Sequence, residues 1–239
     1  MSGAVVKRRT AILISGRGSN MAALIEAAAA QDFPVEIVGV LSDQPQASGL
    51  VLAERLGIPL RAVERRDYAN KDLHDAAIDE VLSDWGTEIV CLAGYMRLLT
   101  PGFVDKWQGK MINIHPALLP AFKGLDTHRR ALETGVRVHG CTVHFVTSEM
   151  DAGPIIAQAA VPVVVGDTEE SLSARVLKAE HQLYPLALRM VAEGKARMID
   201  GAAVFPGLDD GSGDHPGLVI APQPLRAEID LERLARITP

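Results

Sequence analysis

Strand-like and helix-like patterns alternate along the first part of this chain, and few folds accommodate that order. Short apolar runs of the kind found in strands lie at residues 10–15, 35–42, 58–64 and 88–95. Patterns with helical spacing lie between them, at residues 19–30, 47–57 and 70–85. Strands that are apolar at nearly every position need cover on both faces, which the helices of a repeated βαβ unit provide. The sequence therefore predicts an α/β fold with a mostly parallel sheet and helices on both faces.

The pattern changes after residue 116. A helix is expected near residues 127–135. Two apolar runs, 141–146 and 154–163, are close enough in sequence to pair antiparallel. We therefore expect a mixed sheet with an antiparallel C-terminal part.

The end of the chain combines one long helical pattern with a Gly- and Pro-rich tail. The helix fits residues 168–194, with Thr168 as its N-terminal cap and Pro185 as a kink. From about residue 201 the sequence includes PGLDDGSGDHPG and shows no motif that indicates catalysis or binding. We interpret residues 1–200 as a single domain and residues 201–239 as a loosely packed C-terminal extension.

The composition is that of an ordinary globular protein. Of the 239 residues, 48% are hydrophobic and 23% are charged, which is enough to bury a large α/β core. The 24 basic and 30 acidic residues give a net charge of -6, which argues against a broad nucleic-acid surface and leaves only a local phosphate pocket. The sequence contains neither an uncharged apolar run of about 18 residues nor a cleavable leader. We expect a cytoplasmic monomer or homodimer that binds small molecules, with no nucleic-acid or membrane partner.

Motifs for disulfides, metals and a nucleophilic serine are missing. Cys91 and Cys141 lie in separate apolar runs and are expected to be reduced thiols of the core. The seven histidines form no His-Glu-x-x-His motif and no paired-cysteine spacing is present, so we expect no metal site. The Gly-x-Ser-x-Gly motif of a serine hydrolase is also absent.

The segment ISGRGSN follows the first predicted strand and opens the first predicted helix. Gly16 and Gly18 allow a tight turn, and Ser19 and Asn20 can cap a helix whose free N–H groups would point at an anion. Met21 stands where a dinucleotide fingerprint requires a third glycine, and the Gly-Lys-Ser/Thr of a P-loop is absent. A phosphate site and an ordinary glycine turn with a helix cap therefore fit this segment equally well.

Asn113 and His115 are two residues apart in the otherwise apolar run INIHPALLP. Residues two apart in a strand point to the same side, and Pro116 stops regular pairing directly behind them. If residues 141–146 pair with this strand, the loop that holds Asp151 can fold over the same strand end. An amide, an imidazole and a carboxylate would then share one cleft suited to stabilising an oxyanion. Taken singly, His115 could instead be a satisfied buried histidine and Asp151 an ordinary turn residue.

Five segments, in order, resemble phosphoribosylglycinamide formyltransferase, the folate-dependent enzyme of purine synthesis. They span roughly residues 9–200 and are ISGRGSN, LAGYMRLL, INIHPALLP, GCTVHFVTSEMDAGPIIAQ and RVLKAEHQLYP. HPALLP is shared by several folate formyltransferases and indicates only the superfamily, whereas GRGSN resembles the phosphate-binding loop of this particular family. The resemblance implies a single-domain formyltransferase fold, with 10-formyltetrahydrofolate as the formyl donor and no metal.

The resemblance also implies which residues bind the ribonucleotide. Gly18, Ser19 and Asn20 match the loop that holds its phosphate. Glu180 matches a residue that reaches its ribose. From the sequence alone, however, Glu180 and His181 are better interpreted as part of a solvated helix face.

For the folate and for catalysis, the resemblance implies a second set of residues. Those that match the folate site are Lys71, Met96, Arg97, Leu98, Leu99 and Asn113. Lys71 stands where an arginine is sometimes found. Asn113, His115 and Asp151 match the catalytic trio. Some members have histidine at the position of Asp126, so no role is transferred to that residue.

The implied reaction is attack of the glycinamide amine on the formyl carbon at N10 of the folate. Asn113 and protonated His115 would stabilise the oxyanion, while Asp151 would keep His115 charged and help to move a proton through water. A formyltetrahydrofolate hydrolase would use a similar trio with water as the acceptor, usually behind a regulatory domain for which there is no room before residue 9. A transfer-RNA formyltransferase would add a nucleic-acid-binding domain, for which the tail is too short. A phosphate-binding module without activity would leave the trio without a purpose.

Overall fold

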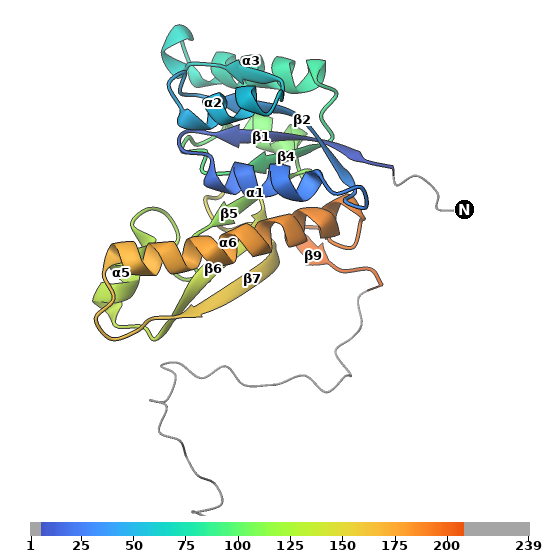
Figure 1. Cartoon of the computed structure of the whole chain (residues 1–239). Helices are drawn as coiled ribbons and strands as arrows, with labels where there is room; N and C mark the ends of the chain where they lie inside the picture. The colour runs from blue at the N-terminus through green and yellow to red at the C-terminus, as the bar shows by residue number, and fades with distance from the viewer. Residues whose placement is uncertain (1–5, 208–239) are drawn as a thin grey trace, which may run out of the picture.

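Seven strands form one sheet with helices packed on both faces (Figure 1). The strands are β1 (Arg8–Ile14), β2 (Val35–Ser42), β3 (Leu60–Ala62), β4 (Ile89–Leu92), β5 (Met111–His115), β6 (Val138–Phe145) and β7 (Ile155–Pro162). The helices are α1 (Ser19–Ala28), α2 (Ser48–Arg55), the 3₁₀ turn η1 (Arg65–Asp67), α3 (Lys71–Asp84), α4 (Pro101–Lys106), α5 (Thr127–Thr134) and α6 (Glu169–Ala192). The computed structural model describes residues 6–207.

The order of the strands confirms the predicted mixed sheet. They lie in the order β3-β2-β1-β4-β5-β6-β7, with parallel pairing from β3 to β5. Strand β6 then pairs antiparallel with β5, and β7 pairs antiparallel with β6. The α/β fold class, with its antiparallel C-terminal part, is therefore as expected from the sequence.

Alternation along β1 shows how the sheet separates two apolar layers. Ile12 and Ile14 belong to the layer that includes residues of α1, α2 and α6, whereas Ala11 and Leu13 belong to the layer that includes residues of α3 and α4. All four side chains are fully buried. Burial of each Ile or Leu side chain contributes about 1.5–3 kcal/mol. Helices on both faces thus explain why residues 11–14 of this strand are all apolar.

The helix and core features expected from the sequence are largely present. Thr168 caps α6 as predicted, since its Oγ1 accepts from the Ser171 N–H at 3.3 Å and Ser171 Oγ accepts from the Thr168 N–H at 3.0 Å. Pro185 lies inside α6, and the kink expected there stays a prediction. Cys91 and Cys141 are buried and unpaired, which confirms them as core thiols.

Helix α4 and a hairpin, like the turn η1, were not anticipated from the sequence. Helix α4 begins at Pro101 after Thr100, whose side chain accepts from the Phe103 N–H at 3.4 Å. A small hairpin, β8 (Arg197–Ile199) and β9 (Ala202–Val204), follows α6. The domain boundary expected at residue 200 falls in the turn of this hairpin. Most of the expected extension, from residue 208 onward, lies outside the described residues.

The strand order reverses between β1 and β4, and this reversal marks an edge suited to binding. From β1 the chain proceeds to β2 on one side, whereas β4 and β5 lie on the other side. In open α/β sheets, ligands bind outside the carboxyl ends of the strands at such a point. Within residues 6–207, no helix has both the length and the apolar character needed to cross a membrane, and no group of three or more His, Cys, Asp or Glu side chains could hold a metal ion.

Candidate active site

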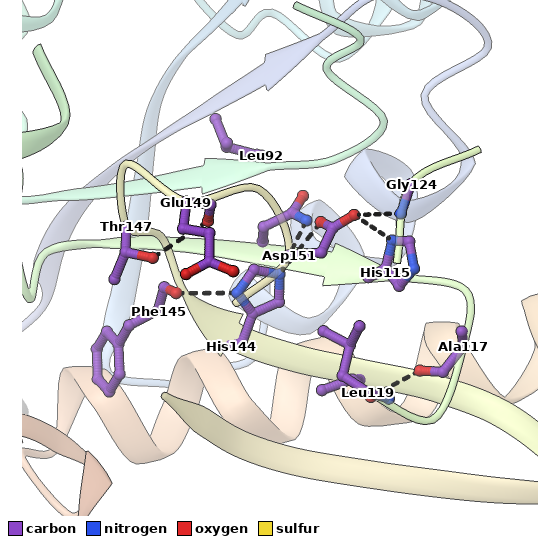
Figure 2. Close-up of polar contacts among 12 residues, drawn as sticks. Leu92, His115, Ala117, Leu119, Gly124, His144, Phe145, Thr147, Glu149 and Asp151 are labelled. Carbon is purple, nitrogen blue, oxygen red and sulfur yellow. Dashed lines mark hydrogen bonds and ion pairs between the residues drawn. The ribbon is translucent and has the colours of Figure 1, made fainter. Parts of the chain in front are cut away.

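His115 and Asp151 contact each other at the carboxyl end of β5. Strand β6 pairs with β5, which is the condition on which a shared cleft depended, and Asp151 lies in the loop between β6 and β7. His115 Nδ1 is 3.4 Å from Asp151 Oδ2, and Figure 2 shows the two side chains facing each other. Asn113 lies two residues before His115 on the same strand, and its Nδ2 is 3.2 Å from His144 Nε2. The structure therefore brings the three predicted residues to one strand end.

Both ring nitrogens of His115 face oxygen acceptors. Nε2 lies 2.9 Å from the carbonyl oxygen of Phe122, and Nδ1 faces the Asp151 carboxylate. The residue is 5% exposed. Because a carbonyl oxygen can only accept, Nε2 carries the hydrogen, and a doubly protonated ring would satisfy both partners. The N–H expected to stabilise an oxyanion is thus already bonded to Phe122.

The backbone around Asp151 fixes the position of its carboxylate. Asp151 has φ +50°, a left-handed conformation that aspartate tolerates better than most residues. Its Oδ2 accepts from the Gly124 N–H at 2.9 Å. A Cβ at Gly153 would lie 1.8 Å from the Phe145 carbonyl oxygen, so only glycine lets the loop return this closely to β6. The segment that contains Gly124 and the close return of the loop to β6 therefore both hold Asp151 in place.

His144 is a member of this cluster that we did not predict from the sequence. Its Nδ1 donates to the Phe145 carbonyl at 2.9 Å, which leaves Nε2 of the neutral ring to accept from Asn113 Nδ2. Burial lowers the pKa of His144, which favours that neutral ring, although the Phe145 carbonyl and Asp151 oppose the shift. His144 Nε2 also lies 3.8 Å from Asp151 Oδ1. The segment TVHFV showed a histidine within an apolar strand, but only the register of β6 on β5 placed His144 opposite Asn113.

The GRGSN loop begins α1, but not through the caps that we expected. Gly18, with φ +72°, occupies the N-cap position, and Ser19 and Asn20 are the first two residues of the helix. Capping by Ser19 and Asn20 was therefore a wrong prediction. A Cβ at Gly18 would lie 3.1 Å from Gly49 Cα, so close packing against α2 favours glycine there. The first N–H groups of a helix have no partner within the helix, so this end of α1 can still receive an anion.

Glu180 does not lie on a solvated helix face, which corrects the interpretation from the sequence alone. It is 6% exposed, and its Oε2 accepts from Asn20 Nδ2 at 2.7 Å. Burial raises the pKa of Glu180, and the bond from Asn20 partly opposes this shift. Within the described residues, Asn20 Oδ1 has no hydrogen-bond partner. The fold thus joins the start of α1 to α6 in one polar site.

The segment after β4 presents its side chains at the same edge of the sheet. Met96 and Leu98 are 66% and 63% exposed, whereas Leu99 is partly buried against the core. Arg97 Nε lies 3.9 Å from Asp43 Oδ2. Lys71 is exposed at the first residue of α3, a separate element. A cavity of about 530 Å³ lies between the loops after β1, β2 and β4, and its lining includes Ser15, Arg17, Asp43, Met96 and Arg97.

This polar cluster at the edge of a mixed α/β sheet places the chain in the formyl transferase class. The family model described as "Formyl transferase" matches residues 8–188. Within this class, the chain belongs to the phosphoribosylglycinamide formyltransferase family, as its sequence motifs indicated. It is 41% identical over 196 residues to phosphoribosylglycinamide formyltransferase of Escherichia coli (strain K12), a match that covers 82% of this chain and 92% of that protein.

Other relatives extend the comparison. The crystal structure of phosphoribosylglycinamide formyltransferase from Brucella melitensis is similar with a TM-score of 0.76 and 56% identity, over 78% of this chain and 96% of that one. The trifunctional purine biosynthetic protein adenosine-3 of Bos taurus is 53% identical over 192 residues, which are 80% of this chain but only 19% of that protein. A formyltetrahydrofolate deformylase from Pseudomonas syringae has a TM-score of 0.77 at 28% identity, over 83% of this chain and 66% of that one.

Proposed function

We propose that this protein transfers the formyl group of 10-formyltetrahydrofolate to the amine of glycinamide ribonucleotide, in purine biosynthesis. The observation that carries the proposal is the contact of His115 Nδ1 with Asp151 Oδ2 at 3.4 Å, on the strand that also bears Asn113. This cluster supplies an amide donor, an imidazole and a carboxylate, which are the groups that acyl transfer to an amine requires.

The nucleotide would bind against the start of α1. The N–H groups of Gly18, Ser19 and Asn20 suit a phosphate because they lie at a helix N-terminus. Glu180 and Asn20 Oδ1, which has no hydrogen-bond partner among residues 6–207, provide buried acceptors for ribose hydroxyls. The buried pair therefore supports the assignment of Glu180 to the ribose.

The folate would bind against the segment after β4. The exposed side chains of Met96 and Leu98 suit a flat ring system, and backbone groups of residues 96–99 can recognise its polar edge. Asn113 would complete this site beside the formyl group. Lys71 presents an exposed ammonium group suited to the carboxylates of the folate, and we propose it as a peripheral contact.

The mechanism follows from the positions of the donors. As the amine attacks the formyl carbon, negative charge develops on the formyl oxygen. Asn113 Nδ2 has a second N–H beyond the one directed at His144, and it can donate to that oxygen. His115 Nε2 can donate as well once it exchanges the Phe122 carbonyl for the oxyanion. Each such donor is worth about 3 kcal/mol in comparable sites.

Asp151 would support His115 and the transfer of a proton. Its carboxylate faces Nδ1, where it stabilises positive charge on the ring. Asp151 can also accept a proton from the attacking amine through water and help to deliver it to the leaving N10. No step of this scheme requires a metal, because side-chain donors meet the developing charge.

Formyltetrahydrofolate hydrolysis is the second candidate. The similarity of the fold to the Pseudomonas syringae deformylase favours it, since water could replace the amine at the same trio. Three features support the transferase instead. These are the higher identity to the formyltransferases, the GRGSN loop and the buried Asn20–Glu180 pair.

A single assay separates the two candidates. Purified protein is incubated with 10-formyltetrahydrofolate, with and without glycinamide ribonucleotide, and release of tetrahydrofolate is followed. We expect release only with the nucleotide, together with formylation of its amine. Release at the same rate without the nucleotide would favour the hydrolase.

We further propose that residues 1–200 suffice for this activity. Cytoplasmic location, small molecules as the partners and a monomeric or homodimeric state complete the proposal. The composition and the family support these assignments. Activity of a chain that ends at residue 200 would test the domain assignment, and a chain that ends at residue 207 is the comparison, because it keeps β9 paired with β8.

A further inference from the structure

Asp43 is a buried carboxylate that belongs to neither predicted substrate site. It directly follows β2 and is 2% exposed. Its Oδ1 accepts from Ser15 Oγ at 2.5 Å, and Ser15 lies at the end of β1, where the GRGSN loop begins. Its Oδ2 accepts from Gln44 Nε2 at 3.1 Å. Burial of this carboxylate is thus compensated by side-chain donors.

Ser15 extends this contact to the segment assigned to the folate. Ser15 Oγ donates to Asp43 and at the same time accepts from the backbone N–H of Met96 at 2.9 Å. The Ser15 N–H donates to the Gly94 carbonyl at 3.1 Å. A continuous hydrogen-bonded path therefore leads from Met96 through Ser15 to Asp43.

The segment after β2 also supports the loop assigned to the nucleotide. The Gly49 N–H donates to the Gly16 carbonyl at 3.1 Å. A Cβ at Gly49 would lie 2.4 Å from Ile14 Cδ1 and 3.1 Å from the Gly16 carbonyl oxygen, so glycine permits this close approach. In the segment assigned to the folate, Arg97 Nε lies 3.9 Å from Asp43 Oδ2. Asp43 thus contacts Ser15, which adjoins the proposed nucleotide loop, and Arg97, which belongs to the proposed folate segment.

We propose that Asp43 and Ser15 are a positioning pair that couples binding of the nucleotide to binding of the folate. The inference rests on the proposed function, because it uses the assignment of residues 18–20 and 96–99 to the two substrates. Ser15 Oγ can bond both partners only while the ends of β1 and β4 keep one relative position. A ligand that orders either loop therefore reduces the cost of ordering the other. Asp43 is not a catalytic residue in this scheme.

The coupling is measured with tetrahydrofolate, which has no formyl group to transfer. Its Kd is determined by calorimetry for the full-length protein, alone and with saturating glycinamide ribonucleotide. We expect at least about fivefold tighter binding with the nucleotide in the unmutated protein, which is the lower end of typical coupling. Asp43→Leu and Ser15→Ala should each reduce this ratio to below about twofold and raise both KM values, with kcat changed by less than about threefold.

Two further variants separate positioning from general stability. Asp43→Asn retains an oxygen that can accept from Ser15, so it should restore most of the coupling. Asp167 is a partly buried carboxylate that pairs with Arg175 at 2.7 Å, away from both loops. Asp167→Asn should lower the Tm but leave the coupling ratio and both KM values unchanged.

The outcomes distinguish this inference from the proposed function. Failure of the unmutated protein to bind either ligand would contradict the proposed function, and the inference with it. Binding of both ligands without coupling would overturn the inference alone. Full coupling in Ser15→Ala would also overturn the inference. Because Ser15→Ala removes only one oxygen atom, it keeps the test available if Asp43→Leu does not fold.

Discussion

The Nε2 atom of His115 lies 2.9 Å from the carbonyl oxygen of Phe122 and donates its hydrogen to it. Phe122 has φ +56°, which is unusual for a bulky residue and carries backbone strain. In our mechanism an oxyanion replaces this carbonyl as the partner of His115. In that mechanism the Phe122 carbonyl would hold the imidazole in place until the substrate binds.

Loss of either proposed oxyanion donor should greatly reduce turnover. We expect His115→Ala or Asn113→Ala to lower kcat by at least about a hundredfold, because each removes a donor to the developing charge. Both residues lie at the end of β5, so the fold should survive, as circular dichroism would check. Near-normal kcat in both variants would contradict the assignment.

Replacement of Asp151 by Asn should change how the rate depends on pH. The Asn side chain cannot stabilise positive charge on His115 and cannot accept the proton, so kcat should fall strongly. Affinity for the nucleotide should change little, because the site assigned to it lies on α1 and α6. An Asp151→Asn enzyme with the pH–rate profile of the unmutated protein would rule out this role.

Gly18→Val should impair use of the nucleotide but not of the folate. The substitution places a β-branched side chain at φ +72° and 3.1 Å from Gly49 Cα, which distorts the loop. We expect the KM for glycinamide ribonucleotide to rise well over tenfold with folate binding nearly intact. Gly57→Val is a matched control, since Gly57 has φ +68° with no atom within 4 Å of a Cβ. It should leave both KM values unchanged.

The phosphate dependence of the same loop gives a second readout. Glycinamide riboside, which lacks the phosphate, should be a poor acceptor for the unmutated enzyme. Gly18→Val should make little difference to its use, because the loop acts on the phosphate. Equal use of riboside and ribonucleotide by the unmutated enzyme would show that the loop does not bind phosphate.

His144 should act through Asn113. In His144→Leu the Asn113 amide loses the acceptor that orients it, so we expect kcat to fall roughly tenfold, a loss of about 1.4 kcal/mol. Because the effect passes through one amide, adding His144→Leu to Asn113→Ala should cost little more. Steady-state kinetics of both single variants and the double variant test this. Fully additive losses would show that His144 acts independently of Asn113.

His139 should weaken the fold on acidification. It is 1% exposed, neither ring nitrogen has a hydrogen-bond partner within the described residues, and its ring packs edge-on against Phe122 and His128. Burial and, to a smaller extent, the charge of His128 lower the pKa of His139 from 6.5 to about 4, and the nearby Pro116 backbone partly opposes the shift. As the pH falls through this window, the unfolded chain binds a proton and the folded chain does not. Stability is therefore lost between these pH values, by up to about 3 kcal/mol.

Urea unfolding of His139→Leu tests this explanation. The free energy of unfolding is measured at several pH values from above 6.5 down to about 4. These limits are the pKa of an unperturbed histidine and the pKa of His139 in the folded protein. The variant should lose less stability across this range than the unmutated protein, whatever their difference at neutral pH. Parallel losses in both proteins would assign the acid sensitivity to other groups.

The alternation of strand and helix patterns was sufficient to predict the fold class. The apolar part of β1, residues 11–14, needs two covered faces, and a parallel sheet with helices on both sides meets that need. Asn113 and His115 were predictable as a pair for an equally local reason, since residues two apart in a strand share a side. Properties that depend on neighbours in the chain are thus determined by the sequence itself.

Contacts between distant segments were decided only by the tertiary structure. Glu180 pairs with Asn20 across 160 positions, and no helical pattern could show that this carboxylate is buried rather than solvated. His144 became part of the site through the register of β6 on β5, which depends on the packing of the whole sheet. Gly18, rather than Ser19 or Asn20, occupies the cap position, with a left-handed φ of +72° and its backbone close to Gly49 of α2. In each case the deciding energy comes from burial and close contact between elements, which the order of residues along one element does not record.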